Sequence, residues 1–490
     1  MRPLIEEIAT ELTPEQLTEQ LAGEPGVVLL RSGLFDSTQG RYSFVAAWPF
    51  LTFRSLGSVC ELSLFEGTEV QFGNPWHLLE AFMSRYELLE EVDLPFPLGG
   101  CFGYWGYDLK NFVEPKLPRR AINDLELPDC LVGFYDSLTV FDHCLGKTWV
   151  VSTGLRADGS RNDRLARDRI KLWRGVLQSK GSLWTALEDS VRSRRTSPSA
   201  SSGESHSDLK RATAGLTSNL SAVEFITRVE RVQAYIKAGD IYQVNLSHRL
   251  SAPLCGSGWD LFQRLSAVSP SPFSAYVDCG EFQLVSSSPE LFLRMSGTHI
   301  QTRPIKGTRP RSPDPTRDAQ LSYELQTSTK EMAELVMITD LLRNDLGRVC
   351  EFASVLVPEL VRLERYSQVQ HLVSTVEGRL RPEVTHFAAF ASCFPGGSIT
   401  GAPKFRAMEI IDEIEPISRG PYTGALGYLG FNRESQLSII IRAAIVKAGA
   451  AYFHAGAGIV ADSLPQAEYE ETLSKAQGFF RALERNFVRA

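Results

Sequence analysis

The chain has 490 residues, 43% of them hydrophobic and 22% charged, which is typical of a soluble globular protein longer than one ordinary domain. Its formal net charge of −7 argues against nucleic acid or an anionic membrane as the main partner. It has no apolar run of the roughly 18 residues that predict a membrane span, no secretion signal, and no Cys-x-x-Cys pair, so we expect a cytoplasmic protein.

Short runs of β-forming residues broken by Gly and Pro alternate with amphipathic helical patterns along the chain. In the first part we predict strands at Val27–Arg31, Tyr42–Ala47, Val59–Phe65 and Leu138–Phe141, and helices at Trp76–Leu88 and Arg161–Lys180. Later we predict a helix at Ser221–Ala238 and strands at Leu284–Ser287, Leu291–Met295, Ala425–Phe431, Leu437–Val446 and Ala450–Ala455. Runs of neighbouring strands and then helices indicate an α+β fold, a large α/β sandwich of antiparallel sheets flanked by helices.

One segment has a different composition. Residues 189–219 are rich in Ser, Arg and small residues and contain few large apolar side chains. Such a segment buries too little surface to offset the entropy of ordering it, so we predict a flexible linker. This divides the chain into an N-terminal region, 1–188, and a C-terminal region, 220–490.

Two pairs of glutamates stand at helical spacing. Glu331 and Glu334 lie three residues apart in a helical pattern that continues to Asp345, and Glu468 and Glu471 repeat the spacing near the end of the chain. Each pair alone is more simply a solvated helix face. Two pairs facing each other would form an oxygen-lined site suited to Mg²⁺.

Two further segments combine turn residues with polar groups. Residues 394–404 read FPGGSITGAPK and open a helical pattern, so their backbone N–H groups could hold an anion, although an ordinary turn would have this composition too. Residues 302–311 read TRPIKGTRPR, which predicts a rigid loop. Its Lys306 is a nucleophile candidate if burial activates it, but a single lysine is more often a surface charge.

These motifs, in this order, resemble the chorismate-utilising enzymes, a family of anthranilate, aminodeoxychorismate, isochorismate and salicylate synthases. The resemblance is close over residues 221–480 and weaker through 41–46 and 99–104. It implies a chorismate substrate, a Mg²⁺ cofactor, and a large sandwich with the active site in the C-terminal region.

The resemblance also implies roles for individual residues. Glu334 and Glu471 would bind Mg²⁺ directly, with Glu331 and Glu468 in support. The substrate would be bound by Gln243, Thr400, Tyr422, Arg442, the Gly456 backbone and Lys475. His371 matches the active-site histidine of the family, although without its motif we would interpret it as a core histidine.

Three positions favour amination at C4 of the ring, which is the aminodeoxychorismate synthase reaction. Gln243 stands where water-activating members carry a lysine base, and glutamine cannot take a proton. Lys306 stands where anthranilate synthases typically have alanine, and in the family mechanism this lysine attacks C2. Glu290 matches the general acid that protonates the departing C4 hydroxyl. The alternative is anthranilate synthase component I, which aminates C2 and releases pyruvate.

Ammonia is expected from a separate glutamine amidotransferase, because the chain lacks the Gly-x-Cys-x-Gly context of such an enzyme. Feedback-controlled anthranilate synthases carry Leu-Leu-Glu-Ser in their tryptophan pocket, whereas this chain has Arg31 in place of that glutamate, so we expect no tryptophan inhibition. A non-catalytic homologue is a third possibility, against which the retained set of polar residues argues.

Overall fold

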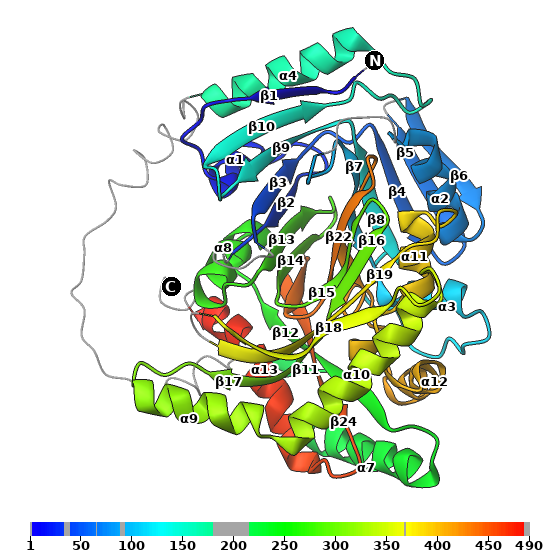
Figure 1. The fold of residues 1–490 in the computed structure, drawn as a ribbon, viewed down its shortest axis with the longest axis vertical. Helices are drawn as coiled ribbons and strands as arrows, with labels where there is room; N and C mark the ends of the chain where they lie inside the picture. Colours follow the sequence, from blue (N-terminus) through cyan, green and yellow to red (C-terminus); the bar gives the residue numbers. More distant parts are fainter. Residues whose placement is uncertain are drawn as a thin grey trace.

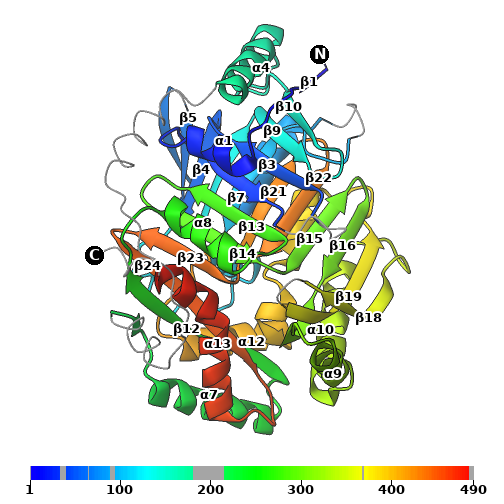
Figure 2. The same ribbon diagram turned by 90° about the vertical axis from the view of Figure 1, so that its left-hand side faces the viewer.

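The computed structural model describes residues 2–33, 40–64, 66–88, 94–179, 215–366 and 369–484. Two large antiparallel sheets, each with twelve strands among these residues, pack face to face, and helices cover their outer sides (Figures 1 and 2). The predicted α+β sandwich is therefore confirmed.

The first sheet contains strands from both parts of the chain. Its order is β1 (Leu4–Glu7), β10 (Lys147–Ser152), β9 (Ser137–Asp142), β3 (Tyr42–Ala46), β2 (Val28–Arg31), β13 (Phe273–Asp278), β14 (Gln283–Ser288), β23 (Ala443–Lys447), β24 (Ala450–Ile459), β12 (Gln243–Pro253) and β11 (Thr217–Ser218). The short β20 (Gly401–Ala402) also pairs with β12.

The second sheet is mixed in the same way. Its order is β17 (Ile305–Pro310), β19 (Val369–Arg379), β16 (His299–Arg303), β15 (Leu291–Ser296), β22 (Glu434–Ile439), β21 (Ala425–Gly430), β7 (Gly100–Trp105), β8 (Cys130–Tyr135), β4 (Leu51–Leu56), β5 (Val59–Leu64) and β6 (Gly67–Phe72), and β18 (Leu356–Arg365) pairs with β19. Where β7 meets β21, Gly103 lies opposite Gly427. A Cβ atom on Gly427 would lie 2.1 Å from the backbone oxygen of Gln436 on β22, the other neighbour of β21, so this position requires glycine.

The largest buried cluster includes both faces of the second sheet. Between the sheets Phe44 of β3 packs on Tyr428 of β21, and on the outer side Trp105 of β7 packs on Phe390 of the helix His386–Cys393. A second cluster lies between the first sheet and α1 (Pro14–Gln20), α4 (Asp163–Gln178), α8 (Gly258–Val268) and α13 (Pro465–Glu484). The remaining helices are α2 (Pro75–Tyr86), α3 (Lys110–Val113), α7 (Ala222–Ala238), α9 (Pro315–Gln326), α10 (Thr329–Gly347), α11 (His386–Cys393) and α12 (Lys404–Ile414). In the described part of the chain, no helix has the length and apolar character needed to cross a membrane.

Most predicted elements are present within a few residues of their expected ends. One strand prediction is wrong: Leu437–Val446 is not continuous but forms the end of β22 and the start of β23, with a break at Ile440–Arg442. The linker predicted at residues 189–219 falls mostly outside the described residues, and only its last five residues are described, with β11 among them. The division of the chain at 188 and 220 therefore stays a prediction.

Candidate active site

Two helices carry the four glutamates of the predicted metal site. Helix α10 begins after Ser328, whose hydroxyl accepts a hydrogen bond from the Glu331 amide at 3.4 Å. The apolar residues of α10 pack toward β19, so Glu331 and Glu334 lie away from the face that contacts this strand. Glu468 and Glu471 lie in the first two turns of α13, and Glu471 is close enough to contribute to the raised pKa of Glu334.

Each of the four carboxylates has a cationic neighbour. The pairs are Glu331 with Arg309 (3.3 Å), Glu334 with Lys330 (4.0 Å), Glu468 with Lys330 (3.7 Å) and Glu471 with Lys475 (2.7 Å). The Ser463 hydroxyl also donates to Glu468 at 2.6 Å. Three cations of the chain itself therefore offset part of the charge of the four carboxylates.

Burial and neighbouring charges shift the pKa values of these carboxyl groups. Burial raises the pKa of Glu334 against the opposing effect of Lys306 and Lys330. Burial also raises the pKa of Glu468, with a further contribution from Glu471. Burial acts to raise the pKa of Glu471, but the ammonium groups of Lys475, Lys330 and Lys306 together outweigh it and the pKa is lowered.

The four glutamates fit a Mg²⁺ ion in chemistry, because this ion takes carboxylate oxygens and completes its coordination with water or substrate. As the side chains stand, no group of three or more His, Cys, Asp or Glu residues in the described ranges could hold a metal ion. Lys330 and Lys475 contact the same oxygens that a metal would need. The donor set fits Mg²⁺ on condition that these oxygens are released.

Lys306 lies on β17, at the edge of the second sheet. The rigid loop predicted for residues 302–311 is wrong, because β16 and β17 both pair with β19 and are separated only at Pro304. A bulge between Lys306 and Thr308 interrupts the register. Gly307 lies in this bulge, and a Cβ atom there would lie 3.0 Å from a Glu331 carboxylate oxygen, so β17 packs directly against α10.

Glu290 follows β14 and is 6% exposed. Burial raises the pKa of its carboxyl group, although the Ser398 hydroxyl and the ammonium groups of Lys306 and Lys475 act in the opposite direction. Glu290 is therefore a buried acid within electrostatic reach of both lysines. A carboxyl group in such surroundings retains its proton more readily than one in water.

His371 lies on β19 opposite Thr308 of β17. Its Nδ1 atom is 2.9 Å from the Thr308 hydroxyl. Burial lowers the pKa of His371 to about 4, and the positive charge of Arg442 contributes to this shift. The imidazole is therefore neutral near pH 7 and can exchange hydrogen bonds without carrying charge.

Gly456, Tyr422 and Lys475 lie together at β24. A Cβ atom on Gly456 would lie 2.9 Å from the Tyr422 hydroxyl and 3.1 Å from the Asn245 side-chain oxygen, so this backbone is closely approached by polar groups. Lys475 donates to the Gly456 carbonyl at 2.9 Å. Burial raises the pKa of Tyr422 to about 12, which keeps its hydroxyl available as a neutral donor.

Gln243 and Thr400 are both fully buried. The Gln243 amide lies against Gly458, and neither its oxygen nor its nitrogen has a hydrogen-bond partner within the described ranges. Thr400 instead directs its hydroxyl to the carbonyls of Gly396 and Gly397, at 3.1 and 3.2 Å. Gln243 therefore has free hydrogen-bonding capacity, whereas the Thr400 hydroxyl stabilises its own loop.

Arg442 explains why the predicted strand is broken. Its φ of 50° lies in the left-handed region, which is costly for a residue with a side chain and frequent at functional sites. Its guanidinium is largely buried, which lowers its pKa, and it forms no ion pair with a carboxylate in the described part of the chain. Arg442 thus has a positive charge available for an anionic ligand.

Comparison with known proteins identifies the family. The model of the family described as chorismate binding enzyme matches residues 35–481. The chain belongs to the chorismate binding enzyme family. An anthranilate synthase component 1 from Thermus thermophilus is 40% identical over 474 residues, which cover 96% of this chain and 95% of the relative. An aminodeoxychorismate synthase component 1 from Escherichia coli is 38% identical over 469 residues, which cover 95% of each chain.

Solved structures agree with this assignment. Anthranilate synthase component I from Streptococcus pneumoniae has a TM-score of 0.70 and 30% identity, and the match covers 91% of this chain and 93% of the other. The menaquinone-specific isochorismate synthase from Escherichia coli shares the fold, with a TM-score of 0.68 at 17% identity over 98% of this chain and 94% of the other. Proteins named for different reactions therefore share this fold.

Sequence reasoning missed three residues that the structure places at the candidate site. Lys330 and Arg309 neutralise the glutamates, and Ser398 hydrogen-bonds to Glu290. All three lie inside the motifs that were recognised, next to residues that received roles. Their charge or hydroxyl was visible in the sequence, but the direction of each side chain was not.

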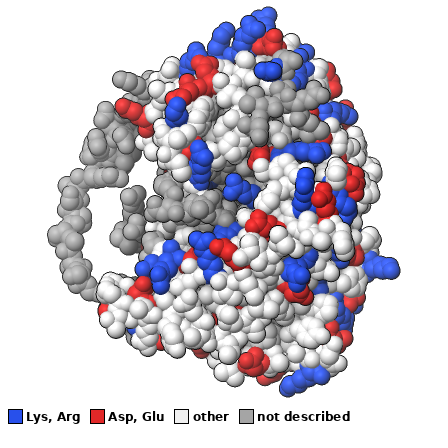
Figure 3. All heavy atoms as spheres, viewed as in Figure 1, with Lys and Arg blue, Asp and Glu red and all other residues white. Residues whose placement is uncertain are grey.

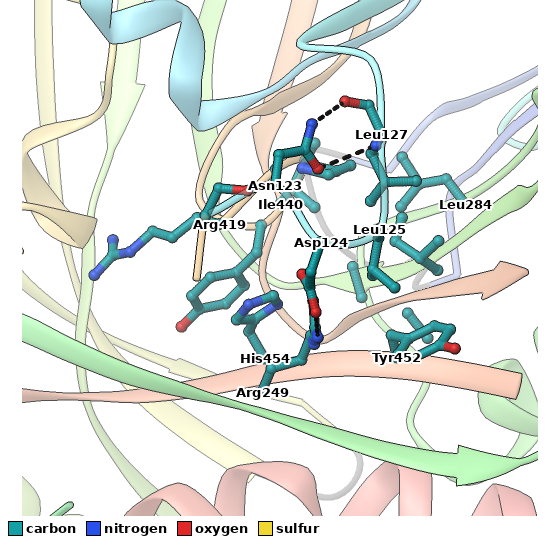
Figure 4. A pocket seen from close by; sticks show the side chains of 17 residues that line it. Asn123, Asp124, Leu125, Leu127, Arg249, Leu284, Arg419, Ile440, Tyr452 and His454 are labelled. Carbon is teal, nitrogen blue, oxygen red and sulfur yellow. Dashed lines mark hydrogen bonds and ion pairs between the residues drawn. The ribbon is translucent and has the colours of Figure 1, made fainter. Parts of the chain in front are cut away.

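A small cavity of about 20 Å³ adjoins the candidate site and shares Tyr422 with it (Figure 4). The Tyr422 ring stacks on His454, with ring centroids 5.0 Å apart. Arg249 and Asp124 form an ion pair at this cavity, with a nitrogen-to-oxygen distance of 2.8 Å. The cavity walls are otherwise mainly apolar, so it differs in character from the charged surface between α10 and α13.

Proposed function

We propose that this chain is the chorismate-aminating component of an aminodeoxychorismate synthase, which forms 4-amino-4-deoxychorismate on the route to 4-aminobenzoate and folate. The observation that carries the proposal is Lys306. It lies on β17 within electrostatic reach of Glu290, Glu334 and Glu471. The Lys306 amine and the buried Glu290 carboxyl are therefore both placed to act on one bound substrate.

The proposed reaction uses the two groups in sequence. The Lys306 amine bonds to C2 of the ring, the ring double bonds shift, and the C4 hydroxyl leaves as water with a proton from Glu290. Ammonia then bonds to C4, the double bonds shift back, the lysine departs as the amine, and the new C4 ammonium returns a proton to Glu290. The net change replaces the C4 hydroxyl by an amino group, with water as the second product.

Other residues would bind the substrate. Arg442 has an unpaired charge for a carboxylate, and Tyr422, Lys475 and the Gly456 backbone provide polar groups nearby. The buried amide of Gln243 can hydrogen-bond to the ring substituents or ammonia, but it cannot remove a proton from water. Thr400 would shape the pocket through its loop, and the neutral His371 would hydrogen-bond without adding charge.

A Mg²⁺ ion bound by Glu334 and Glu471, with Glu331 and Glu468 in support, would neutralise and orient a substrate carboxylate. Ammonia would come from a glutamine amidotransferase partner, as the component 1 designation of the relatives suggests. Acidic and basic side chains are interspersed on the face shown in Figure 3, which agrees with a small-molecule substrate and not with nucleic acid.

Anthranilate synthase component I is the second candidate, because relatives with that designation reach 37–40% identity, as close as the aminodeoxychorismate synthases. Product analysis separates the two. The purified chain is incubated with chorismate, Mg²⁺ and an ammonium salt, with and without an aminodeoxychorismate lyase, and products are identified by mass spectrometry. Formation of 4-aminobenzoate only with lyase supports the proposal, whereas anthranilate and pyruvate without lyase contradict it.

The Lys306→Ala variant tests the role of the lysine. We expect formation of the C4-aminated product to fall by about 100-fold or more, the scale of losing one catalytic group. The matched control is Lys237→Ala, which removes a lysine from the last turn of α7. A Lys306→Ala variant as active as the control would remove the main support for amination at C4.

A further inference from the structure

The ammonium of Lys330 joins the two acidic helices. Its Nζ atom lies 4.0 Å from a Glu334 oxygen on its own helix and 3.7 Å from a Glu468 oxygen on α13. The Lys330 side chain is 44% exposed, whereas those of Glu334 and Glu468 are 15% and 5% exposed. The carboxylates are therefore fixed in the protein, and the cation reaches them from its surface.

The position of Lys330 in its helix is unfavourable for a cation. It lies in the first turn of α10, where the helix dipole favours negative charge. The interaction that compensates is the attraction of the carboxylates on both helices. Without a positive charge between them, Glu334 of α10 and Glu468 of α13 would repel each other, because both lie within 4.0 Å of the same ammonium.

Lys330 and a divalent cation need the same oxygen atoms. Mg²⁺ binds oxygen ligands at about 2.0–2.1 Å with near-octahedral geometry, which leaves no room for an ammonium in contact with those oxygens. A lysine on a flexible four-carbon stem can swing into solvent at small cost. Lys475 differs, because it also donates to the Gly456 carbonyl and is held there.

We propose that Lys330 is an internal counter-ion that holds α10 and α13 together in the metal-free protein and is displaced when Mg²⁺ binds. This inference rests on the metal site in the proposed function. Mg²⁺ affinity is then set partly by a competition within the chain. Removing the lysine strengthens metal binding and weakens the metal-free state.

The test compares metal binding by the full-length protein and its Lys330→Met variant, without chorismate. Mn²⁺ is the probe, followed by electron paramagnetic resonance, with Mg²⁺ added to displace it. We expect about a 10-fold lower dissociation constant in Lys330→Met. The control is Lys147→Met, which removes an equally exposed lysine, also 44% exposed, that pairs with Glu7 at 2.7 Å on β1. Equal or weaker binding by Lys330→Met, or no binding by any of the proteins, overturns the proposal.

Thermal unfolding gives a second, independent measurement. Without divalent cations, Lys330→Met should unfold at a lower temperature than the wild type, and saturating Mg²⁺ should remove this difference. Without divalent cations, Lys330→Arg, which keeps the positive charge, should unfold at the same temperature as the wild type. A Lys330→Met variant whose deficit persists in Mg²⁺ would show a merely structural lysine. Neither measurement uses the reaction, so a product other than the C4-aminated one would contradict the proposed function and leave this inference standing.

Discussion

Two groups of charged side chains lie in the C-terminal half, and they differ in how their charges are paired. Arg419 and Glu415 are almost fully buried, with side-chain exposures of 1% and 5%. Arg419 donates to both Glu415 oxygens at 2.7 and 2.8 Å, and its remaining donors contact Asn245 O, Ile399 O and the Thr423 hydroxyl. Three of the glutamates of α10 and α13 instead depend on lysines that are 44% exposed, and Glu331 depends on Arg309, which is 30% exposed; two of the lysine contacts are 3.7 Å or longer.

The difference indicates what each group is for. A buried pair whose hydrogen bonds are all made within the protein is fixed, because any movement leaves a charge without solvation. Carboxylates held by a long, partly exposed side chain can exchange that partner for another cation. The first group therefore positions the loops around Tyr422, and the second is available for ligands.

The largest effect should come from breaking the buried pair. Arg419→Met leaves Glu415 buried without its partner, and we expect a loss of about 3–5 kcal/mol in the free energy of unfolding. Urea denaturation monitored by circular dichroism measures this loss. If the variant is too unstable to purify, Arg419→Lys should show a smaller loss, because one charge remains but the planar fork is absent. A loss below about 1 kcal/mol in Arg419→Met would show that the pair is not essential.

At α10 the comparison predicts a large loss of activity without a loss of stability. Glu334→Gln should lower chorismate consumption in the presence of Mg²⁺ by about 100-fold, the upper range for loss of metal-site groups. Its metal-free stability should be equal or higher, because burial raises the pKa of Glu334 and so disfavours its charge in the folded state. Activity assays and thermal unfolding check the two parts, and a destabilised Glu334→Gln protein would contradict the distinction between the groups.

The buried side chain of His386 is also held by hydrogen bonds within the protein, but it is neutral. His386 lies 2.8 Å from the Gly297 carbonyl and 2.9 Å from the Ser435 hydroxyl, so Nε2 donates to the carbonyl and Nδ1 accepts from the hydroxyl. Burial lowers its pKa to about 4 from 6.5. Its contribution to stability is full above pH 6.5 and is lost as the pH falls toward 4, because the unfolded chain binds the proton first.

This pH dependence can be measured with His386→Gln. Between pH 7 and pH 5 the wild type should lose about 2 kcal/mol more than the variant in the free energy of unfolding. Urea denaturation at the two pH values gives the difference. Equal losses in both proteins would mean that His386 does not contribute to the acid sensitivity.

The smallest effect is expected at the surface. Arg231 pairs with Glu413, but the arginine side chain is 59% exposed. Arg231→Met should change the free energy of unfolding by less than about 1 kcal/mol, and added salt should reduce that change further. The variant also serves as the control for Arg419→Met. A loss comparable to that of the buried pair would invalidate the comparison.

The sequence predicted the fold class and the elements with strong periodicity, such as α7 and α10, because hydrophobic spacing alone determines them. It did not predict the break at Arg442, since a left-handed residue inside a β-forming run has no local signal. It also interpreted the Lys306 segment as a loop, because Pro and Gly are typical of turns. Here the bulged pairing with β19 prevails over the local preference.

The sequence proposed the members of the candidate site, which stay a prediction, but it did not give their contacts. Family motifs indicated Glu331, Glu334, Glu468 and Glu471, and the structure brings the helices that carry them together. That Lys330 would bridge two of them, or that the Thr400 hydroxyl would face its own loop, depends on side-chain directions that tertiary packing sets. Residues next to a recognised motif therefore need structural evidence before they receive a role.

The pairing of β2 with β13 and of β7 with β21 has a consequence for synthesis of the chain. Strands made early, at residues 28–31 and 100–105, wait for partners at residues 273–278 and 425–430 before either sheet can close. Until then the nascent protein exposes unpaired strand edges that attract other chains. Such long-range pairing also slows folding. We therefore expect recovery of soluble enzyme in cells to depend on chaperone capacity and growth temperature more than on the final stability of the sandwich.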